Sequence, residues 1–322
     1  MQFSHAQLFL FFLCLSTPAV SRRIGHKHTR IAERQAPACT PTAGESPTVD
    51  DVPAIESAMA ACPSGTIMIP PKTTYHINSE LSFTKCAGCT LQCLLYLTGK
   101  TSGVTVSGLT MRNPPNVFSS VKQSVTNVTY SDLILTAVSK SDALPKNTDG
   151  FDLGGTGIRM ENIKVENGDD CIAIQNGAED ITVTNIQCTG SHGLSIGSIG
   201  KTAGEVDTVK NIHFKNAKMT KCSKAAGIKI YSGGYGTASC YGSDEKECAS
   251  RPSTAKLTDI VVKGFSGKTD KDEPVASINC PAKGTCGLSL SDMKVQSANG
   301  GQEYQCSNAG SIGVNCVPGA SG

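Results

Sequence analysis

A six-residue pattern recurs seven times between residues 104 and 293 and restricts the folds open to this chain. Each copy reads apolar, any residue, apolar, polar, then Gly, Asn or Asp, then apolar. The first three positions alternate as in a strand with one buried face. The fifth position takes residues that tolerate left-handed backbone angles, so we expect a turn there and a buried sixth side chain. The copies are VTVSGL (104–109), VTYSDL (128–133), IRMENI (158–163), ITVTNI (181–186), IHFKNA (212–217), IVVKGF (260–265) and LSLSDM (288–293).

The spacing of the copies indicates a solenoid. Successive copies start 23 to 31 residues apart, except for one interval of 48 residues. A strand-turn-strand unit that repeats at such a period is typical of stacked coils. We therefore predict an all-β chain wound as a single-stranded parallel β-helix, with an all-β sandwich with irregular turns as the alternative. The long interval contains an insertion, Tyr231 to Ser253, which we expect to form a loop outside the stack.

The N-terminal segment reads as a targeting signal. Leu8 to Val20 is an apolar run of 13 residues, too short for a membrane-spanning helix, and Ala19-Val20-Ser21 resembles a cleavage site. We predict a signal peptide over 1–21, a basic pro-segment over 22–35, and a β-helix catalytic domain over 36–322. An N-terminal anchor and a disordered arm are the alternatives for the first two segments. The mature protein is expected to be secreted and extracellular, without a membrane span.

Composition and charge exclude further classes. Hydrophobic residues make up 39% of the chain, enough to fill a core, so intrinsic disorder is excluded. Without residues 1–34 the chain retains 24 basic and 26 acidic residues, a net charge of about −2. This balance gives no basis for nucleic-acid binding.

The cysteines agree with an oxidising compartment. Cys14 leaves with the predicted signal peptide and fourteen cysteines remain, many of them in near pairs that we interpret as disulfides of unassigned connectivity. The spacing of Cys86, Cys89 and Cys93 also permits a zinc site, but no histidine follows at finger spacing. Asn127 begins the only N-glycosylation sequon and is predicted to carry a glycan. The near pairs are Cys171 and Cys188, Cys240 and Cys248, Cys280 and Cys286, and Cys306 and Cys316.

The repeat also predicts where chemistry-bearing side chains meet. Asp169 and His192 each lie eleven residues after the start of a copy, so they share one phase in successive coils about 4.8 Å apart. Asp170 is adjacent, Asp149 ends the preceding coil, and Lys229 lies in the following one. We expect these five side chains to cluster on one outer face.

Such a cluster suits hydrolysis of a glycosidic bond. One carboxyl must remain protonated to donate to the leaving oxygen, and another must be ionised to activate water. Carboxyls of an inverting glycosidase stand about 6.5–9.5 Å apart. A lysine can bind an acidic sugar, and the outer face of a solenoid suits a linear polymer. Each part also has a simpler interpretation: an Asp-Gly turn, a solvated Asp pair, a surface histidine and a solvated lysine.

Four motifs carry a resemblance to a known family. The chain resembles the polygalacturonases of glycoside hydrolase family 28, right-handed parallel β-helix enzymes that cut the galacturonan of pectin. The resemblance runs from about Thr40 to Cys316 and implies that the partner is a pectin or galacturonan polysaccharide. The motifs are NTDGFD (147–152), GDDC (168–171), SHGLSIGS (191–198) and GIKIY (227–231).

The resemblance implies roles for these residues. Asp169 would be the general acid, Asp149 and Asp170 would activate water with inversion, and His192 would support protonation of the acid. Lys229 would bind a galacturonate carboxylate.

Further features are implied by the same resemblance. Asn147 would contribute to substrate binding, and Cys171 would form a disulfide with Cys188 beside the site. No metal or other cofactor is required. The capped β-helix is expected to be a monomer.

The chain departs from the family in two places. The family usually has Arg-Ile-Lys where this chain has Gly227-Ile228-Lys229, so one guanidinium is missing. Relatives also have several further coils near Cys89–Leu97, which implies a shortened N-terminal half here.

These departures leave other functions open. The segment Gly190–Gly193 resembles the exo-acting branch, although xylogalacturonan-cutting relatives have the same residues. A hydrolase of a decorated galacturonan and a catalytically impaired pectin-binding β-helix are therefore alternatives. A lyase on the same fold is the third, but the carboxylate set favours water attack with acid assistance.

Overall fold

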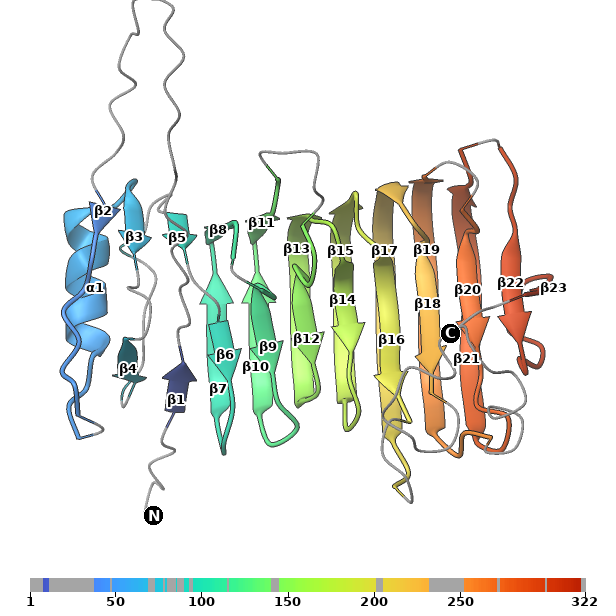
Figure 1. The fold of residues 1–322 in the computed structure, drawn as a ribbon, viewed down its shortest axis with the longest axis horizontal. Coiled ribbons are helices and arrows are strands. Elements are labelled where there is room, and N and C mark those ends of the chain that lie inside the picture. The colour runs from blue at the N-terminus through green and yellow to red at the C-terminus, as the bar shows by residue number, and fades with distance from the viewer. Residues whose placement is uncertain are drawn as a thin grey trace, which may run out of the picture.

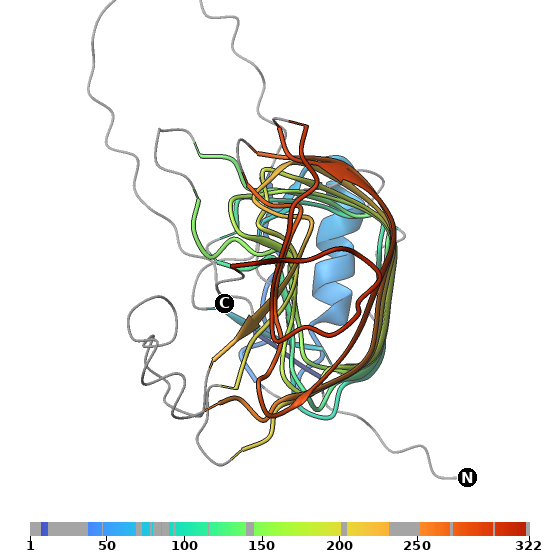
Figure 2. The same cartoon turned by 90° about the vertical axis from the view of Figure 1, so that its right-hand side faces the viewer.

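The computed structural model describes residues 8–11, 38–46, 48–68, 73–77, 79, 85, 90–92, 95–114, 116–139, 145–200, 205–231, 252–270, 273–298 and 300–319. Over these residues the strands stand side by side in a long stack (Figure 1). Seen along that stack, successive coils follow nearly the same outline (Figure 2). The chain is therefore a single-stranded right-handed parallel β-helix, as the repeat and the resemblance predict.

Two parallel sheets form the main walls of the stack. Among the described residues the larger has twelve strands and the smaller has nine, and β1 (Leu8–Phe11) and β4 (Thr74–Ile77) form a separate antiparallel pair. The twelve strands are β2 (Ala38–Cys39), β3 (Thr66–Met68), β5 (Thr90–Gln92), β7 (Ser102–Ser107), β8 (Thr110–Arg112), β10 (Thr126–Ser131), β11 (Ile134–Thr136), β13 (Thr156–Glu166), β15 (Glu179–Thr189), β17 (Thr208–Cys222), β19 (Lys256–Thr269) and β21 (Thr285–Gln296). The nine are β6 (Leu95–Leu97), β9 (Ser119–Val121), β12 (Phe151–Leu153), β14 (Asp170–Ile174), β16 (Gly193–Ile199), β18 (Ala226–Ile230), β20 (Ala276–Asn279), β22 (Tyr304–Ser307) and β23 (Val317–Pro318).

The seven repeat copies lie in register in the larger sheet. Their first residues pair in parallel from coil to coil: Val104 with Val128, then Ile158, Ile181, Ile212, Ile260 and Leu288. Equivalent side chains therefore stack along the axis. A residue at a given phase of one coil lies beside its counterpart in the next coil.

The turn within each copy follows from its fifth residue. All seven fifth positions have positive φ, between 51° and 74°. The left-handed region is disfavoured for most side chains but accessible to Gly, Asn and Asp, which explains the restriction to these residues. The sixth side chain then enters the core in six copies and is partly buried as Met293 in the seventh. The fifth residues are Gly108, Asp132, Asn162, Asn185, Asn216, Gly264 and Asp292.

A helix covers the N-terminal end of the core. Helix α1 (Val52–Ala61) buries Val52, Ile55 and Met59 in the same apolar cluster that the coils enclose. In the view along the stack it lies within the outline of the coils (Figure 2). A disulfide between Cys39 and Cys62 joins β2 to the residue that ends this helix. The first coil is thereby protected from solvent on its open side.

The cysteine interpretation is confirmed where the structure describes both partners. Cys280 is bonded to Cys286, and Cys306 to Cys316. Cys222 is buried and reduced, so the even number of cysteines does not mean that each is paired. Cys86, Cys89, Cys93, Cys240 and Cys248 lie outside the described residues, as does most of the predicted insertion between β18 and β19.

The predicted N-terminal segments lie mostly outside the described residues. Within 1–37 the structure describes β1, which pairs with β4. None of the helices in the described ranges is long and apolar enough to cross a membrane.

Candidate active site

The predicted cluster lies along four neighbouring strands of the nine-stranded sheet. Asp149 precedes β12, Asp169 directly precedes β14 and Asp170 is its first residue, His192 precedes β16, and Lys229 lies within β18. The sheet order β12-β14-β16-β18 places these strands side by side, with Asp170 opposite Gly193. The repeat thus brings residues from four coils to one region of the outer wall.

Asp169 and His192 form the central contact. His192 Nδ1 lies 3.2 Å from Asp169 Oδ1, and the backbone N–H of His192 donates to the carbonyl of Asp169 at 2.8 Å. The carboxylate also accepts the N–H of Asp170 at 2.9 Å and that of Asn147 at 3.1 Å. Burial opposes ionisation, but the hydrogen bond from His192, these N–H groups and the imidazole charge together lower the pKa of Asp169 to about 2.

Asp170 is the buried member of the cluster, with 5% of its side chain exposed. Ser195 Oγ donates to Asp170 Oδ1 at 2.7 Å, and Lys229 Nζ donates to Oδ2 at 3.0 Å. A buried carboxylate requires such partners, because an unpaired charge is costly away from water. The lysine therefore compensates Asp170 in the free protein.

Asp149 has the opposite electrostatic environment from Asp169. Burial is the largest cause, followed by the negative charges of Asp152, Asp169 and Asp170, and together they raise the pKa of Asp149 to about 8. Its own backbone N–H opposes this only weakly. The site therefore contains one carboxyl that keeps its proton near neutral pH and another that loses it in strong acid.

Asp152 is a charged neighbour outside the predicted cluster. It lies between two buried residues of β12, Phe151 and Leu153, so the strand alternation turns it outward toward the cluster. Burial raises the pKa of Asp152, and the nearby Lys122 opposes the rise. The alternation of residues along NTDGFD could have predicted that Asp152 faces the same side as the cluster.

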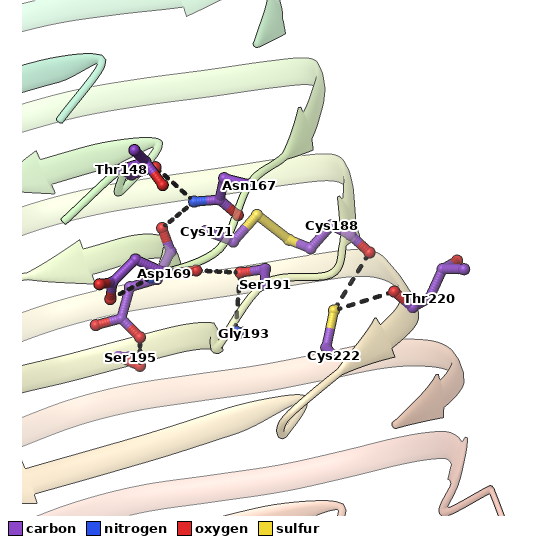
Figure 3. The surroundings of a disulfide bond; sticks show 11 residues. Thr148, Asn167, Asp169, Cys171, Cys188, Ser191, Gly193, Ser195, Thr220 and Cys222 are labelled. Carbon is purple, nitrogen blue, oxygen red and sulfur yellow. Dashed lines mark hydrogen bonds between the residues drawn. A yellow bond between two sulfur atoms is a disulfide. The ribbon is translucent and has the colours of Figure 1, made fainter. Parts of the chain in front are cut away.

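The scaffold behind the cluster holds Asp169 in place. The Asn167 side-chain amide donates to the carbonyls of Thr148 at 2.8 Å and Asp170 at 3.0 Å, and Ser191 Oγ donates to the carbonyl of Asp169 at 2.9 Å. A disulfide joins Cys171 to Cys188 beside these groups (Figure 3). The pairing implied by the resemblance is present, and it ties the start of β14 to β15.

The structure does not test the predicted roles of two residues, Asn147 and Asn127. Asn147 is exposed with φ of 52° and reaches the cluster through its backbone N–H, so substrate binding by its side chain stays a prediction. Asn127 is exposed on β10 and its amide donates to Ser102 Oγ at 3.3 Å. Glycosylation at Asn127 also stays a prediction.

One group in the described part of the chain has the donors for a metal ion. Asp169, Asp170 and His192 each offer an atom, and these atoms lie within 4.8 Å of one another. The Asp169 carboxylate already contacts His192. The Asp170 carboxylate already accepts hydrogen bonds from Ser195 and from the ammonium of Lys229. The cluster is therefore a hydrogen-bonded acid–base group whose positive charge comes from the ammonium of Lys229.

A cavity of about 510 Å³ lies at the C-terminal ends of β9, β12 and β14, and the five cluster residues are not part of its lining. Gln175 belongs to its wall and has its amide 3.5 Å from Asp152 Oδ1. Its lining combines apolar surface with side-chain amides, hydroxyls, one lysine and one aspartate. The lining residues are Val121, Lys122, Gln123, Ser124, Gly154, Gln175, Asn176, Ser198 and Asp207.

Three carboxyls and a histidine gathered on the outer wall of a β-helix form the acid–base group that a glycoside hydrolase needs, and comparison with known proteins identifies the family. Residues 83–241 match the model for Glycosyl hydrolases family 28. The probable endo-xylogalacturonan hydrolase A of Aspergillus flavus is 38% identical, over 96% of this chain and 97% of that protein. The chain therefore belongs to glycosyl hydrolases family 28.

Two further relatives come from Aspergillus tubingensis. Its endo-xylogalacturonan hydrolase A is 40% identical over 88% of this chain and 91% of that protein. The crystal structure of endo-xylogalacturonan hydrolase from the same organism covers 89% of this chain and 100% of its own, with 37% identity and a TM-score of 0.64. The likeness to this structure confirms the predicted fold.

The relatives are longer than this chain. The alignment with the Aspergillus flavus protein has 397 positions, whereas the chain has 322 residues. At least 75 positions of that relative therefore have no counterpart here. The chain is shorter than its relatives, as expected, and the placement of the missing coils near Cys89–Leu97 stays a prediction.

Proposed function

We propose that this chain is a secreted, endo-acting hydrolase of a galacturonan that carries neutral sugar substituents, as xylogalacturonan does. The arrangement of Asp169 and His192 beside Asp149 and Asp170 supports hydrolysis. The names of the relatives support a decorated substrate and endo cleavage. We therefore choose endo cleavage over the exo preference drawn from Gly190–Gly193.

In the proposed reaction, Asp169 donates its carboxyl proton to the glycosidic oxygen as the bond to the anomeric carbon breaks. Asp149 and Asp170 orient a water molecule and accept its proton as the water oxygen bonds to that carbon. Asp169 and Asp170 approach within 4.8 Å, less than the usual span of an inverting pair. Asp149 is therefore the carboxylate on which the inverting assignment depends.

The protons of the free site must be redistributed before this reaction. Asp149 holds a proton near neutral pH, while Asp169 is ionised beside His192. We propose that substrate binding expels water from Asp169 and favours proton transfer from His192 Nδ1, 3.2 Å away, as Asp149 releases its proton to solvent. The charges of the free site favour the reverse assignment, with Asp149 as acid and Asp169 as base. A substrate whose leaving group departs without being protonated distinguishes these two assignments of acid and base.

The alternative of a pectin-binding protein rests on Gly227 and on the shortened N-terminal half. The position offers no guanidinium to a sugar carboxylate, and the loss of a charge-assisted contact weakens binding by about 1.5–3 kcal/mol. Loss of one binding contact lowers affinity without removing the acid–base group. Hydrolysis therefore remains the function that the site supports best.

Product analysis tests the proposed substrate and cleavage mode. Purified protein is incubated with xylogalacturonan and with unsubstituted polygalacturonate, and products are sized while viscosity and reducing ends are followed. We expect faster release from the decorated polymer, oligomers of mixed length, and an early fall in viscosity, because endo cleavage cuts within chains. Release of monomers or dimers alone at constant viscosity would contradict endo cleavage.

We also propose that residues 1–21 are removed on secretion and 22–35 during maturation. The apolar run, the small residues before Ser21 and the basic stretch that follows support this. Intact-mass measurement of the protein from culture medium is expected to show a chain that begins at or near Ala36. A mass that retains Met1 would contradict the processing.

A further inference from the structure

Gly227 leaves a space that another side chain fills. Its φ is not in the left-handed region, so the backbone does not require glycine here. A Cβ at this position would come within 2.5 Å of Lys224 Cε and 3.0 Å of Lys224 Cδ. The methylene stem of Lys224 therefore lies directly across Gly227. Any larger residue would force this lysine to move.

Lys224 is directed toward the carboxylate cluster. Gly227 pairs with Ser195 on the neighbouring strand, and Ser195 donates to Asp170. The charges that act on Lys224 are those of Lys229, Asp170, Glu273 and Asp169. Two lysines therefore lie close to the same acidic residues, one on each side of Gly227 in the sequence.

The two lysines differ in their partners. Lys229 Nζ donates to Asp170 Oδ2 at 3.0 Å. Lys224 has neither a hydrogen bond nor an ion pair with any residue that the structure describes. Burial, followed by the charge of Lys229, lowers the pKa of Lys224. An anion placed beside Lys224 would relieve both effects.

We propose that Lys224 is a substrate-binding residue whose ammonium binds the carboxylate of a uronate unit next to the acid–base cluster, and that Gly227 provides the space for it. This inference rests on the proposed function, since it assigns a second cation to the same polysaccharide site. The guanidinium missing at position 227 is replaced by an ammonium supplied three residues earlier. A lysine binds such a group as a point charge, so the site should select the free acid over its methyl ester.

A binding experiment isolates the charge of Lys224. The parent is an Asp169→Asn protein, which is not expected to cleave the ligand, and calorimetry measures its affinity for unsubstituted trigalacturonate and for the fully methyl-esterified trimer. Lys224→Met is added to this parent because methionine retains an unbranched stem without the charge. We expect binding of the free acid to weaken about tenfold or more and binding of the ester to change by less than about twofold.

Two further variants test the geometry. Gly227→Ala keeps the charge but places a Cβ where the Lys224 stem lies, so we expect a similar selective loss for the free acid. Lys218→Met removes an exposed lysine from β17, in the opposite wall, and is expected to leave both affinities unchanged. Thermal unfolding of each protein verifies the fold. If Lys224→Met fails to fold, Gly227→Ala still tests the inference.

Three outcomes would overturn the inference. Unchanged binding of the free acid by both Lys224→Met and Gly227→Ala would show that the ammonium does not meet the carboxylate. Equal losses for acid and ester would show that Lys224 only supports the local packing. If the wild-type protein hydrolyses galacturonans, either result rejects the role of Lys224 alone. If a folded wild-type protein neither hydrolyses nor binds uronate oligomers, the proposed function and this inference both fail.

Discussion

Asp169→Asn is expected to lower hydrolysis of the polymer about a thousandfold, because the amide cannot protonate the leaving oxygen. On an aryl galacturonide with a good leaving group, such as a dinitrophenyl glycoside, the same variant is expected to lose less than about tenfold, since that group departs without a proton. Asp149→Asn is expected to lose activity on both substrates, because water must be activated in each case. The rates kcat and kcat/KM are measured on both substrates for each variant.

The opposite pattern would contradict the proposed roles. If the activated substrate rescues Asp149→Asn and not Asp169→Asn, Asp149 is the acid, as the charges of the free site favour. Asp292→Asn is a matched control. It makes the same chemical change at an exposed turn with φ of 51°, a conformation that asparagine tolerates, and is expected to retain full activity.

Asp149→Asn is also expected to stabilise the protein at pH 8 and to have little effect at pH 4. The pKa of Asp149 is raised from 3.8 to about 8, so its contribution to stability is fully present below about pH 4 and is lost as pH rises through about 8. Asparagine removes this loss. Allowing for partial exposure, we expect a gain of about 1–3 kcal/mol at pH 8, or several degrees in Tm.

Asp169 contributes with the opposite sign. The pKa of Asp169 is lowered from 3.8 to about 2, so its contribution is present above about pH 4 and is lost as pH falls through about 2. Together the two carboxyls favour maximal stability near pH 4. Thermal unfolding from pH 3 to pH 9 tests this for wild type, Asp149→Asn and the Asp292→Asn control. A Tm difference between wild type and Asp149→Asn that is constant with pH would contradict the raised pKa.

The fold was predictable because one physical constraint repeats in every coil. Each copy needs a left-handed turn followed by a buried side chain, and this leaves a pattern in the sequence from Gly108 to Asp292. Because the coils stack in parallel, residues at the same position of successive repeats are neighbours in space. Asp169 and His192 share a phase in successive coils, so their contact was predictable from the spacing of the repeat.

The rest of the site depends on contacts that have no period. The raised pKa of Asp149 results from burial among carboxylates of different coils. The position of Lys224 depends on the absence of a side chain at Gly227. The disulfide between Cys39 and Cys62 depends on α1, for which the repeat contains no signal. Such features require the packed structure.

Proton NMR of the wild-type protein acting on xylogalacturonan tests the proposed inverting hydrolysis most directly. We expect new reducing ends to appear first as β anomers from the α-linked chain and to equilibrate later, because Asp149 and Asp170 activate water on the face opposite the leaving group that Asp169 protonates. First products with retained configuration, unsaturated ends, or no cleavage by demonstrably folded protein would contradict this assignment of the carboxylate cluster.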